Sequence, residues 1–338
     1  MGSLFDNGMH HHGVLLTDIR LIWLNDAKNA ETAKTHPHYR FDLMTNPSPA
    51  AIPDFSPTFI AQLAKEDVAR ALKEDVGTGD LTASLIDPAR RTHAHILARE
   101  SAVICGAAWV EAAILGLDPS AKLNWLVGEG QRCEADEVVL QIEGLAGKLL
   151  SAERTALNFL QLLSAVATKT AQYVAVVHGT RAHIVDTRKT LPGLRLAQKY
   201  AVACGGGTNH RIGLYDAVLI KENHIAAAGG IGPVLTKARA NAPQAKFIEI
   251  EVETLTQLTE ALDAGAKMVL LDNMSVPTLL KAVLINEGRA ILEISGGVTL
   301  DGLRTLAETG VDRISIGTLT KDVKAVDFSM RFESNLTS

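Results

Sequence analysis

The sequence contains few aromatic residues and few cysteines. Phe, Trp and Tyr make up 4% of its 338 residues, which disfavours an aromatic-rich sandwich and favours helices packed on buried parallel strands. The cysteines, Cys105, Cys133 and Cys204, are odd in number, widely spaced and not part of a CxxC pair. They predict neither a disulfide framework nor a zinc site, and they fit a reducing cytoplasm.

Long uninterrupted apolar runs are also missing. The longest apolar stretch, residues 102–117, contains Glu111 and is shorter than the roughly 20 residues that span a bilayer. Charged residues interrupt the apolar residues near the N-terminus at Asp18, Arg20 and Asp26, which disfavours a cleaved signal peptide. We therefore expect no membrane segment.

The net charge of −5 is unevenly distributed. Residues 154–221 contain nine Lys or Arg and two Asp, a balance of +7, so the rest of the chain carries −12. A local positive segment on an acidic chain predicts a pocket for a small anion, because nucleic-acid binding needs a broad basic face. Among these cations we expect Lys169, Arg181 and Lys199 to be solvated helix charges.

Three regions differ in their patterns. Residues 1–50 show clustered His and no periodicity, and we predict a disordered extension whose histidines are extra residues at the start of the chain rather than a metal site. Residues 51–165 mix both periodicities, which predicts a small domain with an antiparallel sheet. Helices are predicted over 59–73, 107–115 and 151–171, and strands over 93–99 and 138–142.

From residue 166 to 321 an apolar strand-like run ending in polar residues alternates six times with a helical segment. The runs are 182–186, 217–220, 246–251, 267–271, 290–294 and 313–316, and helices are predicted over 194–203, 255–264 and 300–308. Strands that alternate with helices indicate a parallel α/β barrel of six or seven units. In such barrels the chemistry lies at the carboxyl ends of the strands, so these ends identify candidate site residues.

The third run carries three carboxylates on one face. Glu249, Glu251 and Glu253 alternate with apolar residues, so they point away from the covering helices and into the barrel. A buried carboxylate is costly unless a cation, a metal or a ligand hydroxyl pairs with it. Glu251 is therefore a site candidate, with a structural ion pair as the alternative.

Glycines mark the last two strand ends. Ser295, Gly296 and Gly297 precede a helix, and Gly317 follows the next strand, which is where barrels commonly bind phosphate through backbone N–H groups. Plain turns are the alternative. The chain lacks both a dinucleotide-binding fingerprint and a Walker A sequence, so nucleotide cofactors are not indicated.

Three further positions leave alternatives open. Lys221 could form a Schiff base, although its cationic neighbours favour a carboxylate or phosphate ligand. Asp272 could bind a sugar hydroxyl or a hydrated Mg²⁺. His93 and His95 could chelate a metal, but without a third ligand nearby a solvated strand face is favoured.

Seven motifs in order resemble those of one family, the quinolinate phosphoribosyltransferases, which are the carboxylating nicotinate-nucleotide pyrophosphorylases of NAD biosynthesis. The resemblance runs from Phe59 to Phe332. Its motifs are residues 153–158 (ERTALN), 186–193 (DTRKTLPG), 205–211 (GGGTNHR), 219–224 (LIKENH), 249–253 (EIEVE), 271–273 (LDN) and 295–297 (SGG).

The resemblance implies a type II phosphoribosyltransferase fold of the α/β class. It implies an N-terminal α/β sandwich over 51–165, against which residues 322–338 pack, and an incomplete seven-stranded barrel over 166–321. It implies a homodimer or larger assembly with shared sites. The implied reaction converts quinolinate and phosphoribosyl pyrophosphate (PRPP), with Mg²⁺, into nicotinate mononucleotide, pyrophosphate and carbon dioxide.

The resemblance also implies roles for individual residues. The quinolinate carboxylates would be bound by Arg154 of a neighbouring subunit, Arg188, His210, Arg211 and Lys221. The pyrophosphate side would be bound by Lys189 and Lys221, the ribose hydroxyls or Mg²⁺ by Glu251 and Asp272, and the 5′-phosphate by Ser295, Gly296, Gly297, Gly317, Thr318 and Leu319. Catalysis would rest on Lys189, Lys221, Glu251 and Asp272, and the role of Lys321 is left open.

The charge pattern agrees with these roles, because a pyridine dianion beside a phosphate ester requires a dense cluster of fixed cations. Three rivals remain at this level. They are a related phosphoribosyltransferase with another acceptor, a lyase that uses Lys221 as a Schiff base, and a binding protein without turnover. The set of carboxylate-binding cations favours quinolinate.

Overall fold

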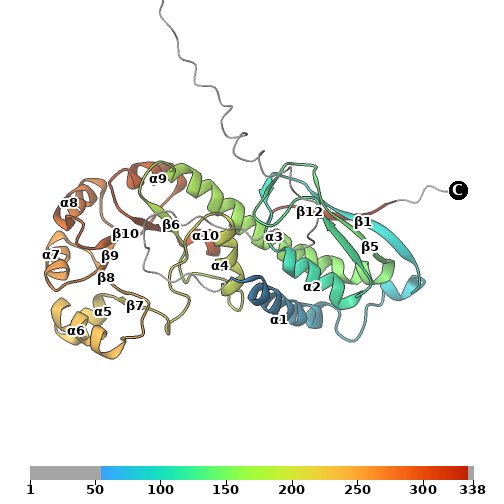
Figure 1. Cartoon of the computed structure of the whole chain (residues 1–338), viewed down its shortest axis with the longest axis horizontal. Coiled ribbons are helices and arrows are strands. Elements are labelled where there is room, and N and C mark those ends of the chain that lie inside the picture. The colour runs from blue at the N-terminus through green and yellow to red at the C-terminus, as the bar shows by residue number, and fades with distance from the viewer. Residues whose placement is uncertain (1–54, 334–338) are drawn as a thin grey trace, which may run out of the picture. The chain divides into compact units, whose positions relative to one another are not determined.

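The computed structural model describes residues 55–333 (Figure 1). The extension predicted over residues 1–50 lies outside that range, and so do the last five residues of the chain. Between residues 55 and 333, no helix is both long and apolar enough to cross a bilayer. The cytoplasmic location stays a prediction.

The N-terminal region contains an antiparallel sheet in the order β12-β1-β5-β3. Its strands are β1 (Arg91–Ala98), β3 (Lys122–Trp125), β5 (Val138–Leu145) and β12 (Phe328–Phe332), and a separate pair joins β2 (Ala102–Val103) to β4 (Arg132–Cys133). Alternate residues of β1 face opposite sides, so Ala94 and Ile96 are buried while His93 is exposed. Both strands predicted in this region are confirmed.

Helices cover one side of this sheet (Figure 1). They are α1 (Pro57–Asp75), α2 (Ala107–Leu117) and α3 (Ala146–Val177), and a short 3₁₀ turn, η1 (Ala83–Leu85), precedes β1. Ser56 begins α1 by accepting the Phe59 N–H, and Pro57 supplies a helical φ at the first position. The fully buried Trp109 of α2 packs in this core. All three helices predicted in this region are confirmed.

Helix α3 is 32 residues long and takes part in both hydrophobic cores. Leu160 and Leu163 pack with the N-terminal sheet, whereas Tyr173 and Val177 pack with the barrel. The predicted boundary at residue 165 falls inside this continuous helix, and the domain boundaries stay predictions.

The second sheet is parallel and has the order β6-β11-β10-β9-β8-β7. Its strands are β6 (His183–Val185), β7 (Val218–Ile220), β8 (Ile248–Val252), β9 (Met268–Asp272), β10 (Ile291–Ser295) and β11 (Arg313–Ser315). Each lies within or overlaps one of the six predicted runs. The α/β class and the parallel barrel-type sheet are therefore confirmed.

The seventh strand position is reduced to one residue. Thr208 forms a single parallel bridge to Val185 on the side of β6 that faces away from β11. In the described part of the chain no ladder joins Thr208 to β7. The sheet is therefore open between Thr208 and β7, as expected for an incomplete barrel.

Helices follow the strands and lie around the outside of the sheet (Figure 1). They are α4 (Arg195–Cys204), α5 (Glu222–Ala228), α6 (Ile231–Asn241), α7 (Leu255–Asp263), α8 (Val276–Asn286), α9 (Leu300–Ala307) and α10 (Thr318–Lys321). Thr254 and Gln257 form a capping box that begins α7. The three helices predicted with bounds are confirmed, and α5, α6 and α8 follow strands after which a helical segment was predicted without bounds.

After α10 the chain returns to the N-terminal sheet. Strand β12 pairs antiparallel with β1, with Ala94 opposite Phe332. The N–H of Val326 donates to the Gln161 carbonyl of α3. Residues 326–332 therefore complete the N-terminal sheet rather than the barrel.

Candidate functional site

The predicted site residues of the barrel follow the carboxyl ends of its strands. Because all six strands run parallel, these ends lie along one edge of the sheet. Arg188 and Lys189 follow β6, Lys221 follows β7, Asp272 ends β9, Ser295 ends β10, and Gly317 follows β11; Glu251 lies in β8.

Arg188 and Arg211 bring two positive charges close together. Burial lowers the pKa of Arg211, and the positive charge of Arg188 lowers it further. The Nε atom of Arg188 is buried and has no hydrogen-bond partner in the protein. A buried donor without a partner is costly, and so is a pair of like charges, so both point to an anionic ligand.

Lys221 and Glu251 face each other across neighbouring strands. Lys221 Nζ lies 2.6 Å from Glu251 Oε2, and the lysine side chain is 46% exposed whereas the carboxylate is 10% exposed. The expected inward direction of this face of β8 is confirmed for Glu249 and Glu251, whose neighbours Ile250 and Val252 pack in the core. The ion pair predicted as the alternative for Glu251 is present, and it does not exclude ligand binding by the exposed lysine.

A hydrogen bond connects the ends of β9 and β10. The Asn273 N–H donates to the Ser295 carbonyl, and its side-chain amide donates to Asp272 Oδ2 at 2.7 Å. Gly296 has a φ of 104°, and a Cβ there would overlap Asn273 Oδ1. Only glycine fits this conformation beside Asn273, so Gly296 and Asp272 are held next to each other.

Gly317 allows Lys189 to lie against the end of β11. A Cβ at Gly317 would come within 2.8 Å of Lys189 Cδ. The Thr320 hydroxyl donates to the Lys189 carbonyl at 2.8 Å, which fixes the loop after β6. Next to Gly317, Thr318 Oγ1 is buried without a hydrogen-bond partner, while the Leu319 side chain is fully buried in the barrel core. Any ligand contact of Leu319 would therefore involve its backbone alone.

His210 points into the barrel rather than toward solvent. Its Nε2 lies 2.8 Å from Glu249 Oε2, and its Nδ1 accepts the backbone N–H of Arg211 at 2.8 Å. Both ring nitrogens are therefore engaged within the protein. In this conformation the ring orients Arg211, and its predicted direct contact with a ligand carboxylate stays a prediction.

Three residues near this histidine, Glu293, Arg313 and Ser315, were not identified as site candidates in the sequence. Glu293 Oε2 pairs with Arg313 Nε at 2.6 Å, and the Ser315 hydroxyl donates to Glu293 Oε1. Burial and the charge of Glu293 raise the pKa of Glu249. The signal that could have identified Glu293 is its charge within an apolar strand. In the fold, Glu293 of β10 lies opposite Arg313 of β11.

Two cations expected to be solvated are not. Lys199 is fully buried and pairs with the equally buried Asp186, because α4 packs its polar side onto the end of β6. Lys169 Nζ donates to the Thr318 carbonyl at 2.7 Å, so this lysine of α3 holds α10. Both predictions were wrong because helical periodicity does not reveal what packs on the polar side of a helix. Arg181 is 64% exposed, as expected.

Arg154 and Lys321 lie apart from these contacts. Arg154 is exposed on α3, and it forms no hydrogen bond or ion pair with any residue between 55 and 333. Lys321 is exposed at the end of α10 and pairs with the adjacent Asp322. The predicted contribution of Arg154 to a neighbouring subunit's site therefore stays a prediction, and the role of Lys321 stays open.

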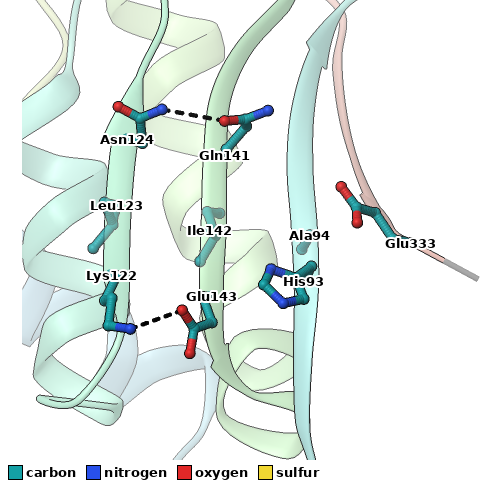
Figure 2. Close-up of a pocket in the computed structure, with 9 residues that line it drawn as sticks. All are labelled: His93, Ala94, Lys122, Leu123, Asn124, Gln141, Ile142, Glu143 and Glu333. Atoms are coloured by element: carbon teal, nitrogen blue, oxygen red, sulfur yellow. Dashed lines mark hydrogen bonds and ion pairs between the residues drawn. The ribbon is translucent and has the colours of Figure 1, made fainter. Parts of the chain in front are cut away.

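Two other features, a surface hollow and a cluster of two cysteines with a glutamate, are accounted for by contacts within the protein. Figure 2 shows a hollow on the outward face of the N-terminal sheet, where Lys122 pairs with Glu143 and Asn124 with Gln141. His93 also lines it. The side chains of Lys122, Glu143, Asn124 and Gln141 are therefore paired with one another.

A cluster of Cys105, Glu129 and Cys204 has metal-ligand atoms within 4.8 Å of one another. The Glu129 oxygens accept the N–H groups of Gly106 and Ala107 at the start of α2, and burial raises the pKa of Cys105 well above 9.0. Capping and packing therefore account for this cluster.

The fold is that of a barrel-type α/β enzyme, and its strand ends carry a candidate site for an anionic ligand. Family models give its identity. The model described as the quinolinate phosphoribosyl transferase C-terminal domain matches residues 166–331, and that of the N-terminal domain matches residues 80–164. The chain belongs to the quinolinate phosphoribosyltransferase family.

Individual relatives agree with this assignment. A probable nicotinate-nucleotide pyrophosphorylase [carboxylating] from Bacillus subtilis is 42% identical over 257 residues, which cover 76% of this chain and 89% of the relative. A quinolinate phosphoribosyltransferase [decarboxylating] from Nicotiana tabacum is 39% identical over 292 residues, 80% of this chain and 83% of the relative. The solved nicotinate-nucleotide pyrophosphorylase from Francisella tularensis superimposes with a TM-score of 0.79 and 40% identity, covering 86% of this chain and all of that one.

Proposed function

We propose that the strand-end site binds quinolinate beside PRPP and that the residues described above divide the two ligands between them. The chain is a carboxylating nicotinate-nucleotide pyrophosphorylase, a pentosyltransferase of NAD biosynthesis. It converts quinolinate and PRPP into nicotinate mononucleotide, pyrophosphate and carbon dioxide.

The pair of Arg188 and Arg211 is the observation that carries the assignment of quinolinate to one part of the site. Quinolinate presents two adjacent carboxylates, and two guanidinium groups held close together match such a dianion. The Arg188 Nε without a partner supplies a donor for one of them. We therefore assign the quinolinate carboxylates to Arg188 and Arg211, with Lys221 beside them.

The phosphate groups of PRPP are assigned to the ends of β11 and β10, next to the loop that follows β6. Lys189 lies over Gly317, and Thr318 presents a hydroxyl without a partner. Gly296 and Gly297 have exposed backbones and positive φ values. A lysine next to open backbone and a hydroxyl suits phosphate oxygens, so we place the 5′-phosphate with Ser295, Gly296, Gly297, Gly317, Thr318 and the backbone of Leu319.

Glu251 and Asp272 fit the ribose and Mg²⁺. Both are carboxylates on the neighbouring strands β8 and β9, and Mg²⁺ prefers one or two carboxylates together with substrate oxygens. When bound, the ion would neutralise charge on the pyrophosphate. Independently of it, the two carboxylates stabilise the positive charge that develops on the ribose when the bond to pyrophosphate breaks.

The two chemical steps need cations more than a base. The quinolinate nitrogen bonds to C1 of the ribose while the C1–oxygen bond to pyrophosphate breaks. The carboxylate next to the alkylated nitrogen then leaves as carbon dioxide. The electron pair left on the ring carbon is stabilised by the cationic ring and takes up one proton from solvent. The cations of the site hold the reactants together against their mutual repulsion.

A shared site accounts for Arg154. This arginine is exposed on α3 and has no partner among residues 55–333. We assign it to the quinolinate carboxylates of a neighbouring subunit in a homodimer or larger assembly. It would bring a further positive charge to the dianion.

The test is turnover of quinolinate by the purified full-length chain, with released carbon dioxide measured in parallel. We expect nicotinate mononucleotide to form only when quinolinate, PRPP and Mg²⁺ are all present, in equal amounts with carbon dioxide. A well-folded protein that leaves quinolinate unchanged but uses another acceptor would contradict the proposal and indicate a related transferase.

A further inference from the structure

A buried ion pair connects α4 to the end of β6. Lys199 of α4 and Asp186 at the end of β6 are both fully buried, and Lys199 Nζ lies 2.5 Å from Asp186 Oδ1. Burial raises the pKa of Asp186 and lowers that of Lys199, which reflects the cost of removing both charges from water. Apolar residues of similar size often replace such pairs without loss of stability. Stability alone therefore does not explain the pair.

The pair also connects two loops that carry site residues. Asp186 Oδ2 accepts Asn209 Nδ2 at 2.6 Å, and Oδ1 accepts the His210 backbone N–H at 2.8 Å. Lys199 Nζ donates in addition to the His210 carbonyl at 3.1 Å. The loops after β6 and after Thr208 thus share one buried anchor.

Each loop carries one of the paired arginines. Arg188 lies two residues after Asp186, and Arg211 directly follows His210. Burial and, after it, the positive charge of Arg188 lower the pKa of Arg211. Because the two like charges repel, a restraint on the two loops favours keeping both arginines in the site. We propose that Lys199 and Asp186 are positioning residues whose buried pair fixes the spacing of Arg188 and Arg211 for an aromatic dicarboxylate.

Lys189, on the same loop as Arg188, has additional restraints that do not involve the Lys199 side chain. Thr320 holds the Lys189 carbonyl, and Gln198 Nε2 in turn donates to the Thr320 carbonyl at 2.8 Å. Loss of the Lys199 pair should therefore disturb quinolinate binding more than PRPP binding. This inference rests on the proposed assignment of quinolinate to the two arginines.

The experiment uses Lys199→Met and the double variant Asp186→Asn/Lys199→Met in the full-length chain. The single variant leaves a buried carboxylate without its cation and is expected to lower Tm. The double variant removes both charges and should regain much of that Tm. In both variants we expect the KM for quinolinate to rise about tenfold or more while the KM for PRPP stays within about twofold, because a small misplacement of binding groups is costly.

Lys237→Met is the matched control, because Lys237 is exposed on α6 and the pair does not involve it. It should leave both KM values and Tm unchanged. A double variant with wild-type KM for quinolinate would overturn the inference, and so would an equal rise of both KM values. Absence of turnover by the wild-type protein would instead contradict the proposed function on which the inference rests.

Discussion

Arg188 and Arg211 both carry an electrostatic cost in the structure without ligand. One has a buried nitrogen without a partner, and the other has its pKa lowered by burial and by its neighbour. A folded protein keeps such a cost where a ligand relieves it. At the scale of single residues, these two arginines therefore favour the proposed assignment of a dianion to them.

Replacing Arg188 by Ala should weaken quinolinate binding far more than PRPP binding. The expected loss for quinolinate is about 2–5 kcal/mol, as for removal of one partner of a desolvated charged contact. Calorimetric titration with each ligand separately measures both effects.

Arg181→Ala is the control for that measurement, because Arg181 is 64% exposed and pairs with Asp312 at the start of the barrel. It should leave both affinities unchanged. Equal losses for quinolinate and PRPP in Arg188→Ala would show that the assignment of its charge to a carboxylate is wrong.

The crossing of α3 and the end of α4 positions the loop that carries His210 and Arg211. A Cβ at Gly205 would overlap the Ala167 carbonyl oxygen and lie 2.7 Å from Thr170 Cβ. The absence of a side chain at Gly205 therefore lets the chain turn directly against α3. At the scale of elements, this close approach sets where the loop begins.

Gly205→Ala should destabilise the protein by about 1–3 kcal/mol, the usual cost of overpacking against atoms that cannot move aside. Gly232→Ala is the matched control, since a Cβ there would meet nothing within 4 Å and φ is not positive. It should leave the free energy of unfolding unchanged or raise it by up to about 1 kcal/mol, because Gly232 lies in α6 and alanine favours a helix over glycine. Urea titration of both variants measures this, and similar values for the two would contradict the packing argument.

At the scale of the whole molecule, the proposed function needs more than one chain. Arg154 belongs to α3 in the N-terminal region, whereas the barrel cations lie at the strand ends, and no hydrogen bond or ion pair links Arg154 to them within residues 55–333. A site completed by a neighbouring subunit would contain one set of barrel residues and one Arg154.

Mixing two inactive variants tests that arrangement. Arg154→Ala and Lys221→Ala subunits should each lack activity alone, and mixed dimers should regain some, because one of their two sites would be complete. Activity is measured after subunit exchange has been verified with differently tagged chains. Verified exchange without recovery would contradict a shared site.

Much of the fold could be predicted from local pattern. The six strand runs of the barrel and the amphipathic helices have periodicities of two and 3.6 residues that are visible in a single segment. The polar strand ends followed from these, because parallel strands present their carboxyl ends at one edge. Strand β12 was not predicted from such periodicities.

The sequence by itself determined the class of fold and the family, and the charge of residues 154–221 predicts an anion-binding segment. These depend on composition, order and spacing, which the chain carries without folding. Tertiary structure decided which charges are buried: Lys199 of α4 pairs with Asp186, 13 residues away, and Glu293 of β10 pairs with Arg313 of β11, 20 residues away. Burial and charge pairing depend on which surfaces meet in three dimensions, so no local pattern could have assigned these partners.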